Sequence, residues 1–218
     1  KEVRKKAEEK INDLLKEINT NVFSFYLTKK QIEILNRFNE QIEILHLSEK
    51  EWENFTEDFV YNTNAIEGST VTEEEVPEIL HKKKAENEEE VETKGVANAV
   101  EYIRHTKEDL SLTLLLNLHK LCFKDSKFFA GQFRNVNVVV RNSLGQILHT
   151  GVPKEELEDY LNDFVGWYNE NKTKFKPLVL AAIIHNQFEH IHPFQDGNGR
   201  VGRLLLNFVL IKNKYPPI

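Results

Sequence analysis

The sequence predicts an all-α fold: a helical domain with a small β-hairpin flap and an N-terminal helical extension. Two patterns lead to this fold class. Apolar residues recur every three or four positions through most of the 218-residue chain, whereas residues 135–149 alternate apolar and polar side chains as a strand does. No internal repeat or Gly/Ser-rich linker interrupts these patterns, so we expect one domain over residues 60–218, preceded by the extension over residues 1–59.

The extension contains two expected helices. The first lies near residues 2–19, where four apolar residues share one helix face: Ile11, Leu14, Leu15 and Ile18. The second begins at a capping box of Thr28 and Gln31. It continues through apolar residues with a period near 3.5: Ile32, Leu35, Phe38, Ile42 and Leu45.

Four more helices are expected before the hairpin. A capping box of Ser48 with Glu51 begins the first of them, and a short helix opens at Thr72. Two longer helices cover residues 88–107 and 111–123. We interpret the acidic run in the first of these as a solvated face and first turn: Glu88, Glu89, Glu90 and Glu92.

Residues 135–149 are expected to form a β-hairpin, because valines at alternate positions precede the turn-forming residues 142–145. A lone hairpin is not stable as an independent sheet, so we expect it to be an exposed flap. Two helices follow, one from Pro153 and one from Pro177 through Phe188.

Composition excludes several classes of protein. Lys and Arg total 29 against 35 Asp and Glu, and the net charge of −6 has the wrong sign for broad nucleic-acid binding. The single cysteine, Cys122, cannot form an internal disulfide and favours a reducing compartment. No segment approaches the ~20 apolar residues of a membrane span. We therefore expect a cytoplasmic protein that binds no membrane and, through this portion, no nucleic acid. Because residues 215–218 carry no terminal helix or cap, we expect the natural protein to continue.

The candidate chemistry lies in residues 192–203, here called the signature segment, which have the pattern of a loop followed by a helix N-terminus. Gly197 and Gly199 leave backbone N–H groups open to an anion, which the helix dipole also favours. Arg200 and Arg203 stand three residues apart, as neighbours on the expected helix. Two guanidinium groups beside an anion site suit a polyphosphate.

Two side chains complete the candidate site. Asp196 offers the hard oxygen ligand that suits Mg²⁺ shared with phosphate oxygens. His192, with an ordinary pKa of about 6.5, can take a proton from an attacking hydroxyl at neutral pH. Phe194 is expected to point inward as an anchor. Each feature alone has a structural explanation, but together within twelve residues they indicate nucleotide chemistry.

The signature segment resembles the motif of the Fic family, His-x-Phe-x-(Asp/Glu)-Gly-Asn-Gly-Arg-x-x-Arg, at every fixed position. The resemblance extends over roughly residues 60–218 and implies a helical fold with one flap. It implies transfer of AMP from ATP to a Ser, Thr or Tyr hydroxyl of a target protein, which the flap near residues 135–150 would align by strand addition. It implies that His192 is the base and Asp196 the Mg²⁺ ligand. The implied ATP-binding residues are Gly197, Asn198, Gly199, Arg200, Val201, Gly202 and Arg203.

A second short segment, residues 63–68, resembles the family's inhibitory motif (Ser/Thr)-x-x-x-Glu-(Gly/Asn) through Thr63, Glu67 and Gly68. Taken alone, the spacing equally fits a helix surface and its C-terminal cap. Beside the signature segment, it implies that Glu67 pairs with Arg203 and takes the guanidinium that the γ-phosphate of ATP needs.

The other candidate ligands are interpreted as structural. His185 and His190 are five residues apart, off a common helix face, and lack cysteine partners, which disfavours a zinc site with His192. His119 and His185 are expected to be core or supporting groups, and Cys122 a buried inert thiol.

The leading hypothesis is an autoinhibited protein adenylyltransferase that uses ATP and Mg²⁺. Gly199 favours AMP transfer, because the related Doc toxins carry Lys there and act as kinases. Two alternatives stay open. The same site could remove AMP from a modified target or transfer another phosphate-containing group, or the chain could be an ATP-sensing helical interaction module. The sequence determines neither the target protein nor the oligomeric state, and a homodimer is compatible with it.

Overall fold

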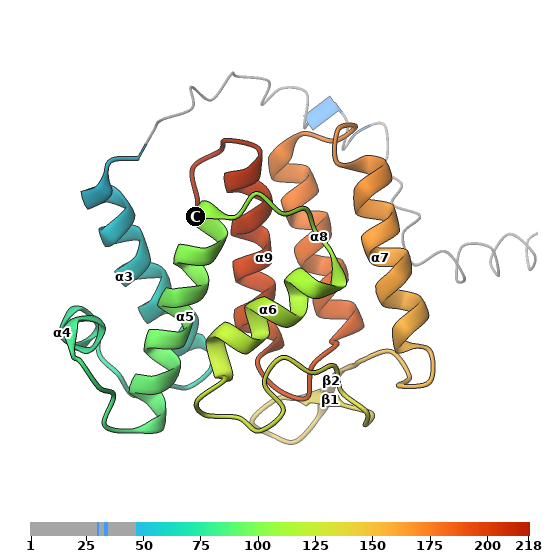
Figure 1. The fold of residues 1–218 in the computed structure, drawn as a ribbon. Helices are drawn as coiled ribbons and strands as arrows, with labels where there is room; N and C mark the ends of the chain where they lie inside the picture. Colours follow the sequence, from blue (N-terminus) through green and yellow to red (C-terminus); the bar gives the residue numbers. More distant parts are fainter. Residues whose placement is uncertain (1–29, 31–32, 35–46) are drawn as a thin grey trace, which may run out of the picture. The chain divides into compact units, whose positions relative to one another are not determined.

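The computed structural model describes residues 30, 33–34 and 47–218 (Figure 1). Over residues 47–218 it contains seven α-helices and one antiparallel hairpin, which confirms the predicted fold class. The helices are α3 (Glu49–Ile66), α4 (Glu75–His81), α5 (Glu88–His105), α6 (Leu112–Phe123), α7 (Leu157–Asn171), α8 (Pro177–Ile191) and α9 (Asn198–Lys212). The strands are β1 (Val139–Arg141) and β2 (Ile147–Thr150). The two helices predicted in the extension lie outside the described residues, apart from Lys30, Glu33 and Ile34, which are helical.

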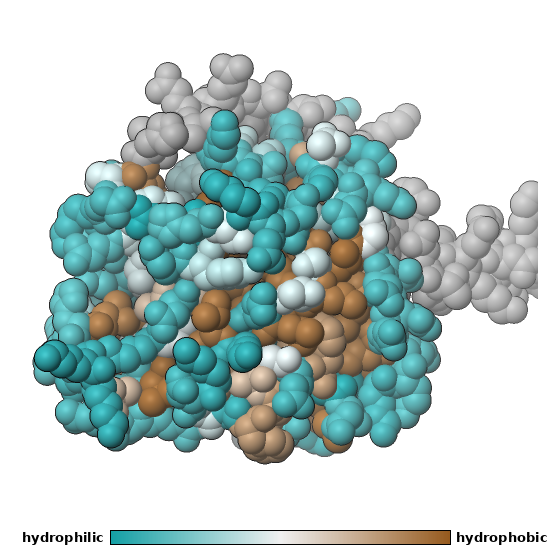
Figure 2. All heavy atoms as spheres, viewed as in Figure 1, coloured by the Kyte–Doolittle hydropathy of each residue, from teal (hydrophilic) through white to brown (hydrophobic). Residues whose placement is uncertain are grey.

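The helices α8 and α9 pack extensively against each other, with α5 and α6 also against α9 and α7 against α8 (Figure 1). Their buried apolar residues include Leu180, Ile184, Phe188, Leu204, Leu205 and Phe208. Burying one such side chain contributes about 1.5–3 kcal/mol. This packing positions the C-terminus of α8 and the N-terminus of α9, which enclose the signature segment. Figure 2 shows apolar residues gathered near the centre of the viewed face, with hydrophilic residues around them. In the described part of the chain, no helix combines the length and apolar character needed to cross a membrane.

Side-chain caps begin three of the seven described helices. Ser48 Oγ accepts a hydrogen bond from the Glu51 N–H (3.3 Å), and Glu51 Oε2 accepts one from the Ser48 N–H (2.6 Å), which confirms the capping box. Side chains of Asn87 and Ser111 cap α5 and α6 in the same way. The predicted boundary between residues 59 and 60 falls within α3 and stays a prediction.

Four helix bounds differ from the prediction. The short helix expected to open at Thr72 begins at Glu75, where only the Thr72 N–H and Glu75 Oε2 of the predicted box are bonded (2.8 Å), and the helix expected over residues 88–107 ends at His105. The helix expected from Pro153 begins at Leu157, because residues 153–156 form a turn closed by the Glu156 N–H and the Pro153 carbonyl (3.0 Å). The next helix continues three residues past Phe188 to Ile191, because the chain leaves the helix only at the following residue, in a left-handed conformation.

The prediction of a solvated acidic face on α5 is wrong for two of its four glutamates. Glu90 is 7% exposed and accepts a hydrogen bond from Lys82 (2.9 Å). Glu92 pairs with Arg200 of α9, and only 12% of its side chain is exposed. The first turns of α5 therefore bury charge, because Lys82 and Arg200 compensate it.

The hairpin is shorter than predicted and exposed. Its paired positions are Val139 with Thr150, Val140 with His149, and Arg141 with Ile147. Residues 135–138 lie outside the paired strands. In this stretch, the Val136 carbonyl accepts a hydrogen bond from Nη1 of Arg134 (2.8 Å) instead. At the turn, Leu144 is 81% exposed.

Candidate active site

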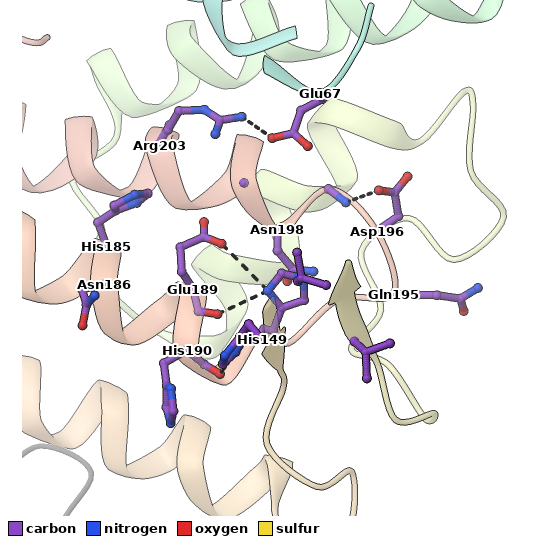
Figure 3. A pocket seen from close by; sticks show the side chains of 15 residues that line it. Glu67, His149, His185, Asn186, Glu189, His190, Gln195, Asp196, Asn198 and Arg203 are labelled. Carbon is purple, nitrogen blue, oxygen red and sulfur yellow. Dashed lines mark hydrogen bonds and ion pairs between the residues drawn. The ribbon is translucent and has the colours of Figure 1, made fainter. Parts of the chain in front are cut away.

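A cavity of about 670 Å³ opens beside the signature segment, between α8, the start of α9, the hairpin and the end of α3 (Figure 3). Most of the predicted site residues line this one cavity. They include His192, Asp196, residues 197–199 and Arg203, together with Glu67 from α3. The fold thus brings together side chains that are up to 136 positions apart in the sequence.

Two buried side chains hold the loop before α9. Phe194 is fully buried, and its ring stacks on His119 with centroids 3.9 Å apart, which confirms its role as an anchor. Asn198, 2% exposed, accepts a hydrogen bond from the Phe194 N–H and donates one to the Phe194 carbonyl, both at 2.8 Å. At the start of the loop, His192 has the left-handed angles φ 54° and ψ 61°, which are uncommon for a residue other than glycine. These contacts oppose the cost of that conformation.

His119 supports the loop from α6, as predicted. The Gly131 N–H donates to Nδ1 of His119 (2.8 Å), so Nε2 carries the proton and donates to the Asp196 carbonyl (3.1 Å). Burial lowers the pKa of His119 to about 4, which keeps the ring neutral. Cys122 of the same helix is buried, and burial raises the pKa of its thiol to about 12, as expected for an inert group.

The N-terminus of α9 faces the cavity and favours an anion. The first N–H groups of a helix have no acceptor within the helix, and the helix dipole places positive charge beside them. Gly197 has φ +80°, and a Cβ there would lie 2.4 Å from the Phe123 ring. A Cβ on Gly199 would lie 2.3 Å from Glu67 Oε1. The Glu67 carboxylate therefore occupies the space beside Gly199, at the helix N-terminus.

Arg203 is held by residues of α3 and its end. Its Nη2 contacts Glu67 Oε1 at 2.5 Å, an ion pair drawn in Figure 3. Its Nε donates to Thr63 Oγ1 (2.6 Å), and Nη2 also donates to the Thr63 carbonyl (3.2 Å). Gly68, with φ +92°, turns the chain away from α3 directly after Glu67. Two of the three polar side chains of the 63–68 segment, Thr63 and Glu67, thus contact the same guanidinium, whereas Asn64 donates to Thr93 Oγ1 (3.4 Å).

Arg200 has other partners than Arg203. Its guanidinium pairs with Glu92 of α5 and lies 4.4 Å from the centroid of the Phe123 ring, and the residue is 6% exposed. Val201 and Gly202 are buried in the helix packing. Arg200 nevertheless lines a second cavity, of about 290 Å³, together with Glu67 and Asp196, whereas Val201 and Gly202 face the interior.

His192 is oriented by Glu189, a residue that the sequence analysis did not single out. Nδ1 of His192 lies 3.2 Å from the Glu189 carbonyl oxygen, which can only accept, so Nδ1 carries the proton and Nε2 is left as the basic nitrogen. Nδ1 also lies 3.9 Å from Glu189 Oε2, and Figure 3 draws both contacts as dashed lines. Burial lowers the pKa of His192, whereas the Glu189 carbonyl raises it. The sequence offered one signal for this contact, the spacing of three residues between Glu189 and His192. That spacing brings the two groups together only because His192 leaves the helix in a left-handed conformation.

Asp196 presents a half-exposed carboxylate at the mouth of the cavity. Oδ1 accepts a hydrogen bond from the Gly197 N–H (2.7 Å), and Oδ2 lies 3.9 Å from Lys127 Nζ. Lys127, also missed by the sequence analysis, is held mainly by Glu88 and Glu92. Among the described residues, no group of three or more His, Cys, Asp or Glu side chains could hold a metal ion without other ligands. A cation at Asp196 would therefore draw further ligands from water or from a bound molecule.

The hairpin contacts the site through His149 and is joined to it through Arg134. Nε2 of His149 lies 2.9 Å from the His190 carbonyl, and its ring centroid lies 6.0 Å from that of His192. Arg134, 5% exposed, donates from Nε to the His192 carbonyl (2.7 Å). Its Nη2 donates to the carbonyls of Val152 (2.5 Å) and Ile191 (3.3 Å). These contacts connect the base of the hairpin to the residues that position His192.

Comparison with known proteins gives one consistent family. Residues 109–210 match the family model described as Fic/DOC family. A protein adenylyltransferase Fic of Nematostella vectensis is 30% identical over 169 residues, which cover 73% of this chain and 38% of that protein. A protein of the same name from Culex quinquefasciatus is 31% identical over 208 residues, covering 88% of this chain and 40% of that protein. This chain thus spans about two fifths of the length of these curated relatives.

A solved structure shares the arrangement of the helices. The Fic domain-containing signalling protein of Bacteroides thetaiotaomicron has a TM-score of 0.73 and 26% identity. The match covers 86% of this chain and 74% of that one.

Proposed function

This chain belongs to the Fic/DOC family, and from that premise we propose that it transfers AMP from ATP to a Ser, Thr or Tyr hydroxyl of a target protein. One observation carries the proposal. A basic imidazole nitrogen, an anion-binding helix N-terminus and a guanidinium lie in one cavity, on His192, residues 197–199 and Arg203. The adenylyltransferase names of the relatives agree with this reaction.

In the proposed reaction, the target hydroxyl attacks the α-phosphorus of ATP. The new oxygen–phosphorus bond forms as the bond to pyrophosphate breaks, and the hydroxyl proton passes to Nε2 of His192. The N–H groups of residues 197–199 bind phosphate oxygens, where they stabilise the charge that develops in the transition state. Arg203 binds the terminal phosphate once Glu67 leaves it.

Asp196 is suited to Mg²⁺ in this reaction. Its carboxylate is half exposed, and the Gly197 N–H occupies only Oδ1, which leaves Oδ2 open to a cation. Carboxylate and phosphate oxygens are the ligands that Mg²⁺ prefers. When bound, the ion would neutralise phosphate charge. The carboxylate itself would orient the ion and keep it beside the phosphates.

We also propose that Glu67 inhibits the enzyme. It pairs with Arg203 and lies beside Gly199, so its carboxylate takes both the guanidinium and part of the space that phosphates would use. The hairpin supports a role in aligning the target: Val139 and Val140 line the cavity, and an extended target segment could pair with the hairpin's edge.

Radiolabelled ATP tests the function. The Glu67→Gly variant is incubated with a cell lysate and with α-labelled or γ-labelled ATP in parallel, and His192→Ala in the same background is the control. We expect protein-bound label from the α position alone, lost in the His192 variant. Label from the γ position would instead indicate a kinase. Label from neither, with ATP bound, would favour a nucleotide-sensing module.

A further inference from the structure

Glu189 is a half-buried residue whose carboxyl group lines the cavity, with 31% of its side chain exposed, and the proposed reaction above does not use that side chain. It lies in the last turn of α8, three residues before His192, and Oε2 is 3.9 Å from Nδ1 of His192. Oε1 is buried and has no hydrogen-bond partner among the described residues. A buried acceptor without a partner costs free energy, so this placement needs an explanation.

Gly202 of α9 makes the room for this carboxyl group. A Cβ on Gly202 would lie 2.2 Å from Glu189 Oε1 and 3.2 Å from Nδ1 of His185. Any side chain at this position would push the carboxyl group out of its place. Glu189 and Gly202, on neighbouring helices, therefore form a matched pair: the carboxyl group stays beside His192 because α9 carries no side chain opposite it.

The charged and titratable groups around Glu189 come from every element packed there. They are His185 on α8, His192 directly after it, Arg203 on α9, Glu67 directly after α3, His149 on β2 and Arg134 before the hairpin. Burial raises the pKa of Glu189 to about 7, while Arg203 lowers it and Glu67 raises it. Burial also lowers the pKa of His192, so it favours the uncharged form of both groups, whereas an ionised Glu189 and a protonated His192 would each stabilise the other.

We propose that Glu189 is a positioning residue whose carboxylate stabilises the protonated ring of His192. The part that concerns catalysis rests on the proposed function. The target hydroxyl gives its proton to Nε2 of His192, and the ring becomes positively charged beside the Glu189 carboxyl group, whose ionised form stabilises that charge. The Glu189 carbonyl fixes the tautomer, and the side chain adds the charge that makes Nε2 more basic.

The test measures the pKa of the His192 ring by NMR on the full chain without nucleotide. The ring signal is assigned as the one that is missing in His192→Ala. In Glu189→Gln, which keeps the shape and removes the charge, we expect the pKa of His192 to fall by about one unit, the lower end of the range for an opposite charge at this distance. Glu158→Gln, an exposed residue on α7, is the matched control and leaves the pKa unchanged. An unchanged or raised pKa in Glu189→Gln overturns the proposal.

Gly202→Ala provides an independent variant if Glu189→Gln fails to fold. The added methyl group displaces the carboxyl group, so the pKa of His192 falls in the same direction, whereas an unchanged pKa counts against the proposal. In the Glu67→Gly background, we expect Glu189→Gln to lower kcat for AMP transfer about tenfold, with KM for ATP within twofold. If the pKa of His192 shifts but the chain transfers no AMP, the interaction of Glu189 with His192 is supported and the proposed AMP transfer is rejected. The failure of one proposal is therefore distinguishable from the failure of the other.

Discussion

Replacing Glu67 with glycine should activate AMP transfer, because the change removes the carboxylate that holds Arg203. The ion pair is partly buried: 23% of the Arg203 side chain and 33% of the Glu67 side chain are exposed. The free energy that the pair contributes should therefore lie between that of an exposed pair, about 0–1 kcal/mol, and the 3–5 kcal/mol lost when a buried pair is broken. We take about 1.4–2.7 kcal/mol, which at about 1.36 kcal/mol per factor of ten corresponds to roughly 10- to 100-fold.

The assay is incorporation of α-labelled AMP into the chain itself and into lysate proteins, with ATP affinity measured by calorimetry on the same samples. Glu67→Gln is the matched control, because it keeps the size of the side chain beside Gly199 and removes the charge. It should activate less than Glu67→Gly, since an amide still blocks part of the phosphate space. Arg203→Ala should not activate, because it removes the phosphate ligand together with the inhibitory contact.

The reasoning is refuted if wild type and Glu67→Gly transfer AMP equally while both bind ATP with the same affinity. In that case, the contact of Glu67 with Arg203 is only part of the end of α3 and does not inhibit transfer. Equal activation by Glu67→Gly and Arg203→Ala would also refute it, since loosening of α3 would then explain the gain.

Three further predictions follow from the site. His192→Ala should reduce AMP transfer about 10²–10⁴-fold with ATP affinity nearly unchanged, and transfer at the wild-type rate would remove His192 as the base. Asp196→Ala should weaken transfer and its dependence on Mg²⁺ together, so an identical Mg²⁺ titration would exclude Asp196 from the metal site. Glu92→Gln leaves the buried Arg200 without its carboxylate, and about 3 kcal/mol at 2–4 °C per kcal/mol predicts a Tm lower by roughly 6–12 °C in thermal unfolding. A change of less than about 2 °C would mean that the pair is not structural.

Local signals predicted most of the fold, because they act within a few residues. The capping box at Ser48 and the proline at the start of α8 need only their neighbours to specify a helix start. The end of α8 was less predictable. The helix continues three residues past Phe188 to Ile191, and nothing next to Phe188 indicates that it ends where His192 adopts a left-handed conformation.

Contacts between distant segments limited the prediction of the site. The spacing of Arg200 and Arg203 predicted two neighbouring guanidinium groups, but it could not show that Glu92, 108 positions away, pairs with Arg200 while Glu67 pairs with Arg203. The role of Glu189 was equally hidden, because it depends on the absence of a side chain at Gly202 of another helix. The sequence therefore predicted which residues belong to the site better than which way each one faces.

Arg134 attaches the hairpin to the rest of the domain through hydrogen bonds to backbone carbonyls, much as a structural metal ion would through oxygen ligands. Its guanidinium donates to four backbone carbonyl oxygens, those of Val136, Val152, Ile191 and His192, an all-oxygen environment like the one that proteins build for Ca²⁺. Because this cation is part of the chain, the attachment needs no dissolved ion and resists chelators. Lysine could not replace it, since one ammonium group lacks the planar fork that reaches several acceptors. None of these four acceptors lies in residues 142–148, so replacing the hairpin tip should leave the attachment of the hairpin to the loop at His192 in place.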